Sequence, residues 1–116
     1  MSESLKLSKG LLNKNVSVVI DRPLKSLHPK HGFEYMANYG YIEGIIAPDG
    51  EELDAYFLGV AKPLETATGI VIAIIHRTDD DDAKLIVVPD GVKLSDDEIE
   101  KAVEFQEKWF KHMIVR

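Results

Sequence analysis

The sequence has no cysteine, no long apolar run and no excess of positive charge. The lack of cysteine excludes a disulfide framework and is compatible with a reducing compartment. The longest uncharged apolar run, residues 69–75, is far too short to cross a bilayer. The formal net charge of -6 opposes nonspecific binding to nucleic acid or to an anionic membrane. We therefore expect a cytoplasmic protein with neither nucleic acid nor a membrane as its partner.

The composition is that of an ordinary globular domain. The chain has 116 residues, of which 45% are hydrophobic and 29% charged, enough to form one core without a metal or a disulfide. No repeat or linker divides it, so we expect residues 1–116 to form a single domain. Residues 1–15 are polar apart from a few leucines, which predicts a loosely held N-terminal arm.

Five short segments have the β-branched and apolar composition of strands. They are residues 16–20, 39–46, 54–60, 69–76 and 84–88, with turn residues between them. Five such strands predict a small barrel. Apolar residues then recur at helical spacing as far as Met113, and Ser95 with Glu98 forms a capping box, so a helix is predicted. The expected fold is mainly β (α+β), a small five-stranded barrel followed by a C-terminal helix.

The first of two acidic clusters, Asp-Gly-Glu-Glu-Leu-Asp at residues 49–54, lies where a turn becomes a strand. The turn breaks strict alternation, so several carboxylates could converge on a metal ion. The alternative is a simple turn followed by a solvated edge. Asp54 stands out because it leads directly into apolar residues, where an unpaired carboxylate is costly and a cation would offset that cost.

The second cluster is the run of four aspartates at residues 79–82, between two predicted strands. Such a run is usually a solvated loop, but a divalent cation would reverse its repulsion. Carboxylate oxygens suit Mg²⁺, with Mn²⁺ as the alternative, and the four histidines show no zinc-type spacing. The neighbouring Lys84 is either an ion-pair partner of Asp82 or a phosphate ligand.

Two further groups could contact an anion. Arg22, just before the loop at residues 24–34, gives this region a local positive bias inside an acidic protein, together with Lys25, Lys30 and two histidines of the loop. Such a loop either is solvated or attracts a polyanion. The three tyrosines at positions 35, 39 and 41 either pack against the barrel or present their hydroxyl groups to an anionic ligand.

Three blocks of sequence together resemble the soluble inorganic pyrophosphatases of the first family. These blocks are Asn-Tyr-Gly-Tyr-Ile at residues 38–42, the acidic block at 49–54, and Asp-Ala-Lys-Leu-Ile-Val-Val-Pro at 82–89. The resemblance implies an OB-like five-stranded barrel with a C-terminal helix. It also implies hydrolysis of pyrophosphate to two phosphates by metal-activated water, and a homo-oligomer, the common state of the family.

The resemblance assigns roles by position. It implies metal ligation by Asp21, Asp49, Asp54, Asp79 and Asp82, a catalytic base at Glu51, and substrate contacts from Tyr39, Lys84 and Lys111. Arg22 and Lys30 are further candidates for substrate binding, because the basic hairpin of the full-length enzymes is shortened here. The family has aspartate where this chain has Glu51, and tyrosine where it has Phe110.

Other functions fit the same residues. The shortened basic loop and the changes at Glu51 and Phe110 also fit a noncatalytic metal- or anion-binding module on the same barrel. Hydrolysis of a different phosphoanhydride is a further alternative. Oligonucleotide binding is suggested by the barrel and the clustered tyrosines but is opposed by the net negative charge.

Overall fold

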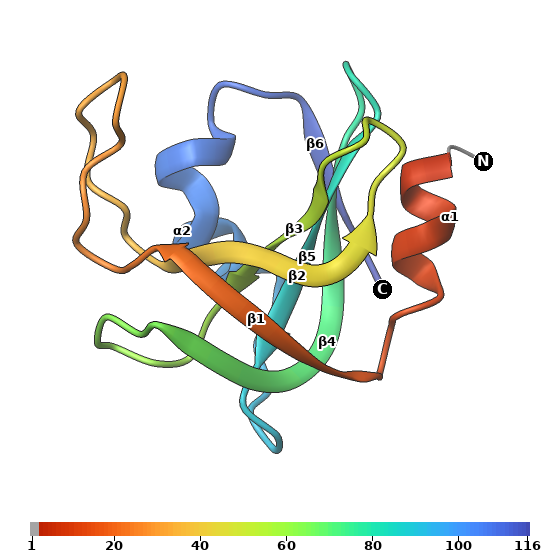
Figure 1. The fold of residues 1–116 in the computed structure, drawn as a ribbon, viewed down its shortest axis with the longest axis horizontal. Helices are drawn as coiled ribbons and strands as arrows, with labels where there is room; N and C mark the ends of the chain where they lie inside the picture. The colour runs from red at the N-terminus through yellow and green to blue at the C-terminus, as the bar shows by residue number, and fades with distance from the viewer. Residues whose placement is uncertain (1–2) are drawn as a thin grey trace.

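The computed structural model describes residues 3–116, which form two helices and six strands. Their order is α1 (Glu3–Lys9), β1 (Asn15–Arg22), β2 (Asn38–Ile46), β3 (Glu52–Phe57), β4 (Thr66–Arg77), β5 (Asp82–Val88), α2 (Asp96–Glu107) and β6 (His112–Val115). The sheet order is β1-β2-β3-β5-β4-β6, and β1 also pairs with β4, which closes five strands into a barrel (Figure 1). The predicted five-stranded barrel with a helix packed on it is confirmed.

Alternate residues of the strands fill the barrel interior. In β1, Val16, Val18 and Ile20 are buried and the residues between them are more exposed, as the two-residue period of a strand requires. Leu53 of β3 and Leu85 of β5 join the same apolar cluster. This alternation leaves the residues between them, among them Asp54 and Lys84, on the outer face of the sheet.

A second apolar layer lies between this outer face and α2. A bulge between Val71 and Ala73 of β4 shifts the alternation, so that Val71 faces the interior while Ala73 packs in the outer layer. Ile99 and Val103 of α2 are fully buried against this layer. The helix begins at the predicted capping box, with Ser95 as its N-cap.

The N-terminal segment differs from its prediction. Residues 3–9 form helix α1, which contacts β4 and β5 and buries Ser4 and Ser8. Leu5, Leu11 and Leu12 pack against the interior cluster. The prediction of a loose arm is therefore wrong for residues 3–12, because these few leucines suffice to hold the segment against the barrel.

The C-terminal helix is shorter than its apolar pattern predicts. It ends at Glu107, and residues 112–115 form β6, which pairs antiparallel with the end of β4. Met113, counted on the helical stripe, is instead exposed in this strand, while Ile114 packs against the outer layer. Neither α1 nor α2, the helices of the described residues, has the length and apolar character of a membrane-spanning helix.

Gly40 is required by the close approach of β1 and β2. It is paired with Ile20, and a Cβ atom at this position would lie 1.7 Å from the carbonyl oxygen of Val19. Any larger residue would therefore push the two strands apart. The glycine keeps the neighbouring Tyr39 at the edge of the cavity described next.

Candidate functional site

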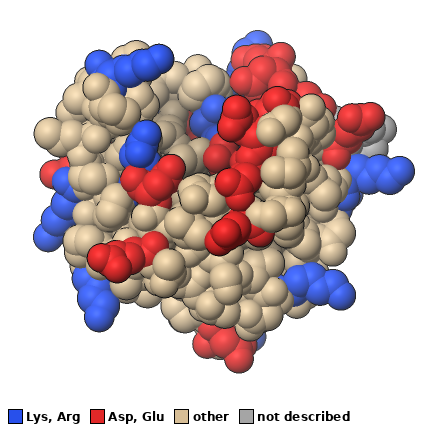
Figure 2. All heavy atoms as spheres, in the orientation of Figure 1, with Lys and Arg blue, Asp and Glu red and all other residues tan. Residues whose placement is uncertain are grey.

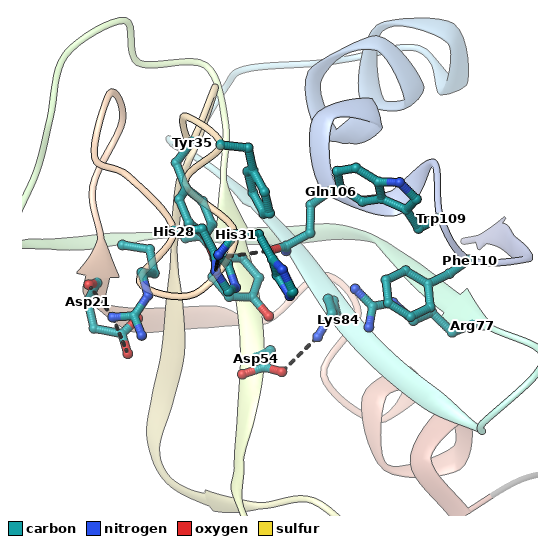
Figure 3. A pocket seen from close by; sticks show the side chains of 13 residues that line it. Asp21, His28, His31, Tyr35, Asp54, Arg77, Lys84, Gln106, Trp109 and Phe110 are labelled. Atoms are coloured by element: carbon teal, nitrogen blue, oxygen red, sulfur yellow. Dashed lines mark hydrogen bonds and ion pairs between the residues drawn. The ribbon is translucent and has the colours of Figure 1, made fainter.

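A cavity of about 710 Å³ opens on the outer face of the barrel, beside the end of α2 (Figure 3). One part of its lining, called here the charged floor, consists of Asp21, Arg22, Asp54, Arg77 and Lys84. Another part, called here the aromatic wall, consists of His28, His31, Phe33, Tyr35, Trp109 and Phe110. Tyr39 and Gln106 complete the lining. The cavity is thus lined by residues from all five barrel strands, from the loop after β1, and from the end of α2 and the segment that follows it.

Lys84 is the centre of the charged floor. Its side chain is only 4% exposed, and its Nζ donates hydrogen bonds to Oδ2 of Asp54 at 2.7 Å and to Oδ2 of Asp82 at 3.1 Å. The parallel pairing of β3 and β5, with Ala55 opposite Leu85, brings Asp54 and Lys84 side by side. The two carboxylates therefore lie next to each other, on either side of one ammonium group.

Arg77, at the end of β4, supplies a second cation to the floor. Its Nε and Nη2 donate to the two carboxylate oxygens of Glu107, each at 2.8 Å, and its Nη1 lies 3.6 Å from Asp82. The guanidinium carbon lies 3.7 Å from the ring centre of Phe110. Burial alone would lower the pKa of Arg77, but hydrogen bonds and the charge of Glu107 raise it, so the group stays cationic.

Glu107 anchors a chain of buried polar groups behind the floor. Its carboxylate, fully buried, also accepts a hydrogen bond of 2.5 Å from the hydroxyl of Tyr56. Gln106 donates to that hydroxyl at 2.7 Å and accepts from the hydroxyl of Tyr35 at 3.0 Å. Burial would raise the pKa of Glu107, but the hydrogen bonds from Arg77 and Tyr56 prevail and lower it. The chain thereby fixes both Arg77 and the loop that carries Tyr35.

Tyr39 and Asp21 have pKa values shifted by the same surroundings. Burial, reinforced by the negative charge of Asp54, raises the pKa of Tyr39 well above its usual value, so the hydroxyl keeps its proton. Burial also raises the pKa of Asp21, although the neighbouring Arg22 acts in the opposite direction. Tyr39 can therefore donate a hydrogen bond to an anion across the whole neutral pH range.

Asn38, the first residue of the Asn-Tyr-Gly-Tyr block, has a structural role. Its buried side-chain oxygen accepts hydrogen bonds from the backbone N–H groups of Leu24 and Leu64, at 3.0 and 3.1 Å. Its amide group donates to the carbonyl of Lys62 at 3.0 Å. Asn38 therefore ties together two loops, one of which forms the rim of the cavity.

The structure brings some of the predicted site residues together and separates others. Five of them line the large cavity: Asp21, Arg22, Tyr39, Asp54 and Lys84. Asp82 does not line it but accepts a hydrogen bond from Lys84, which does. Asp49 lies in a second, smaller cavity of about 330 Å³, which it shares with Asp80, Asp81 and Asp82. Its carboxylate accepts the backbone N–H of Glu51 at 2.9 Å. The side chains of Glu51, Asp79, Lys30 and Lys111 are exposed outside the large cavity.

The acidic residues do not form a complete metal site in this arrangement. Within residues 3–116, no three Asp, Glu or His side chains are grouped closely enough to hold a metal ion. Figure 2 shows Asp and Glu gathered in a band on one face, beside a hollow in which basic groups lie. The neighbouring carboxylates of Asp54 and Asp82 fit the donor set of Mg²⁺, which commonly uses one or two carboxylates with water and substrate phosphates.

Arg77, Gln106 and Glu107 are cavity or supporting residues that the sequence analysis missed. The helical spacing contained a signal for two of them, because Gln106 and Glu107 follow Ile99 and Val103 on the buried stripe of α2. Polar residues on an apolar stripe indicate buried hydrogen-bonding partners. Arg77 had no comparable signal, since its partner Glu107 is far away in the sequence.

A model of the inorganic pyrophosphatase family matches residues 13–114, which include every residue that lines the large cavity. The chain therefore belongs to the inorganic pyrophosphatase family.

The similar proteins include inorganic pyrophosphatases and one enzyme with a different name. The inorganic pyrophosphatase of Pseudomonas aeruginosa is 44% identical over 62 residues, covering 47% of this chain and 34% of that protein. A 3-dehydroquinate synthase of Shewanella is 30% identical over 92 residues, covering 79% of this chain and 23% of that protein. The chain thus spans only about a quarter to a third of these curated relatives. The inorganic pyrophosphatase structure from Ehrlichia chaffeensis has the same fold, with a TM-score of 0.68, 16% identity, and coverage of 87% of this chain and 84% of that one.

Proposed function

We propose that the protein hydrolyses inorganic pyrophosphate to two phosphates in the large cavity, with Mg²⁺ as its metal ion and Mn²⁺ as the alternative. One observation carries the proposal: two buried cations, Lys84 and Arg77, converge with Asp54, Asp82 and Tyr39 inside the region that the family matches. Charge-assisted hydrogen bonds from such cations are the strong contacts that phosphate groups make with proteins.

The residues of the charged floor have distinct parts in this proposal. Lys84 and Nη1 of Arg77 bind the phosphate oxygens, and the hydroxyl of Tyr39 donates a hydrogen bond to them. These donors stabilise the negative charge that develops on the leaving phosphate, and they are already in place before the reaction. Asp54 and Asp82 would hold the metal ion. When bound, that ion supplies water of lowered pKa, so that hydroxide is available near neutral pH.

The remaining assignments belong to the same proposal. Glu51 is the proposed base, and Asp21, Asp49 and Asp79 are the proposed additional metal ligands. Because Glu51 is exposed at the turn that Asp49 begins, its role requires this turn to approach the substrate. We also propose substrate contacts from Arg22, Lys30 and Lys111, a homo-oligomeric state and a cytoplasmic location.

The test is an assay of phosphate release from pyrophosphate, with Mg²⁺, with Mn²⁺ and with a chelator. We expect metal-dependent release, lowered on the order of a hundredfold by Lys84→Met, because an electrostatic contact to the developing charge is lost. Asp54→Asn should lower it as well. Lys93→Met, which removes an exposed lysine outside the cavity, is the matched control. Pure wild-type protein that binds a diphosphonate but releases no phosphate with either metal would instead be a noncatalytic module.

A further inference from the structure

The large cavity is much bigger than pyrophosphate requires. Its volume of about 710 Å³ falls in the range of pockets that enclose drug-sized organic molecules. The cations that suit phosphate groups belong to the charged floor. An ion made of two phosphate groups would therefore leave the part of the cavity next to the aromatic wall unfilled.

The aromatic wall is a set of rings contributed by two separate segments. The ring centre of Phe33 lies 4.8 Å from that of His28 in the loop and 5.5 Å from that of Trp109 after α2. Figure 3 shows the rings of His28, His31 and Trp109 around the same space as Asp54 and Lys84. Trp109 is 59% exposed although it is the largest apolar side chain of the protein. The ammonium group of Lys108 lies 4.7 Å from the ring centre of Trp109, so a flat ligand would stack on the part of the indole that Lys108 and Phe33 leave exposed.

The loop that carries four of the six residues of this wall is held in shape before any ligand arrives. The backbone N–H of His28 donates a hydrogen bond to the backbone carbonyl of Phe33, and the backbone N–H of Tyr35 donates one to the backbone carbonyl of Ser26, each at 2.8 Å. Nδ1 of His28 accepts the backbone N–H groups of Lys30 and His31, both at 3.1 Å, so its Nε2 carries the proton. The wall is thus preformed, which lowers the entropic cost of binding a ligand against it.

We propose that the cavity also binds nucleoside diphosphates, with the phosphates on the charged floor and the base stacked on Trp109 at the aromatic wall. The proposal rests on the proposed function, because the same cations bind the phosphates. In the hydrolysis of the bound nucleoside diphosphate to a nucleoside monophosphate, a water oxygen bonds to the terminal phosphorus and the bond from that phosphorus to the bridging oxygen breaks. The electron pair stays on the bridging oxygen of the nucleoside monophosphate, inorganic phosphate is the second product, and the proton of the water passes to Glu51, the proposed base, and from there to solvent.

Trp109 is the only tryptophan, so its fluorescence reports directly on stacking at the wall. The probe is α,β-methylene adenosine diphosphate, which resists hydrolysis, and the comparison is methylenediphosphonate, which lacks the base. With Mg²⁺ present, we expect the nucleotide analogue to quench the fluorescence and to bind about tenfold more tightly than the diphosphonate, since base stacking adds to the phosphate contacts. Equal affinities without quenching would overturn the proposal.

A pair of variants separates stacking from folding. Trp109→Leu should weaken binding of the nucleotide analogue about tenfold relative to the diphosphonate, as measured by calorimetry. Tyr41→Leu, which removes a half-buried aromatic ring outside the cavity, should leave the ratio of the two affinities unchanged. A ratio unchanged in Trp109→Leu, with the melting temperature of the wild type, would contradict the proposal.

Hydrolysis assays with pyrophosphate and adenosine diphosphate then distinguish the proposal of nucleotide binding from that of pyrophosphate hydrolysis. If pyrophosphate is hydrolysed but the nucleotide analogue neither binds nor quenches, nucleotide binding is refuted and the proposed function stands. If the analogue binds with quenching but neither substrate is hydrolysed, the nucleotide site stands as a binding site and catalysis is refuted. If neither the analogue nor the diphosphonate binds, both proposals fail.

Discussion

The barrel interior and the layer beneath α2 are both buried, yet they are built from different chemistry. The interior cluster is made of apolar side chains such as Val18, Leu53 and Ile74. The layer beneath α2 also has an apolar cluster, but beside it lie the buried ion pair of Arg77 and Glu107 and the hydroxyl of Tyr56. The cavity opens on this polar side of the molecule.

The difference shows what the buried charges of the layer beneath α2 contribute to the cavity. Desolvating two charges costs several kcal/mol, which their mutual attraction repays only in good geometry, so an apolar pair in the same place is often as stable. The ion pair of Arg77 and Glu107 therefore adds little to the stability of the fold beyond what an apolar pair would add. Its effect is to hold a guanidinium group rigidly at the charged floor. The interior has no such task and is packed for stability alone.

The largest expected effect comes from breaking the buried ion pair. Glu107→Ala should lower the free energy of unfolding by about 4 kcal/mol, because it leaves the charge of Arg77 buried without its partner. The double variant Arg77→Met with Glu107→Leu should lose much less, since no buried charge remains. Urea unfolding measures both. If the single variant is as stable as the wild type, the layer beneath α2 is not a low-dielectric environment.

A cavity in the apolar interior should cost slightly less and leave the site alone. Ile74→Ala, at a fully buried position, should lower the free energy of unfolding by about 3 kcal/mol. Its KM for pyrophosphate, measured where the variant is fully folded, should equal that of the wild type. A raised KM would show that the interior and the cavity are coupled, and the contrast between the two layers would then be wrong.

Removing the N-cap of α2 should have a smaller effect. Ser95→Ala deletes the hydrogen bond of 3.1 Å that the hydroxyl accepts from the backbone of Glu98. The expected loss is about 1 kcal/mol in the free energy of unfolding. Ser95→Asp, which keeps an acceptor at the N-cap, is the control and should stay close to the wild type. A loss shared by both variants would point to a role of the serine other than capping.

The smallest expected effect depends on pH. Nε2 of His112 in β6 lies 2.8 Å from Oε1 of Glu100 in α2. Burial alone would lower the pKa of His112, but the hydrogen bond to Glu100 and its negative charge raise the pKa above the usual value of 6.5. The stabilisation is therefore fully present below about pH 6.5 and is lost as pH rises through the higher folded-state value. Because Glu100 is partly exposed, we expect less than about 1 kcal/mol between about pH 6 and pH 9. Thermal unfolding should show this loss in the wild type and not in His112→Gln.

Much of the barrel could be predicted from sequence because its strands carry local signals. Each predicted strand overlaps an observed one, and the capping box fixes the start of α2 at Asp96. β6 was missed because Met113 and Ile114 continue an apolar pattern of helical spacing, and only pairing with β4 makes the segment a strand. Helix α1 was missed because burial of Ser4 and Ser8 comes from tertiary contact with the barrel.

The site could be predicted only in part, for a similar reason. Asp54, Lys84 and Tyr39 were predicted because they interrupt apolar strands or match the family blocks, and all three line the large cavity. Asp49 lies in a different cavity, where its carboxylate accepts a hydrogen bond within its own turn. Arg77 and Glu107 became visible only when folding brought β4 and α2 together. Local patterns predict the elements, whereas pairs across elements need the structure.

The most direct test of the account is a crystal structure of the protein with Mg²⁺ and methylenediphosphonate. We expect phosphonate oxygens within hydrogen-bond distance of Lys84 Nζ and Arg77 Nη1, and Mg²⁺ bound by the carboxylates of Asp54 and Asp82. A diphosphonate bound in the smaller cavity beside Asp49, or a charged floor left empty at saturating ligand, would contradict it.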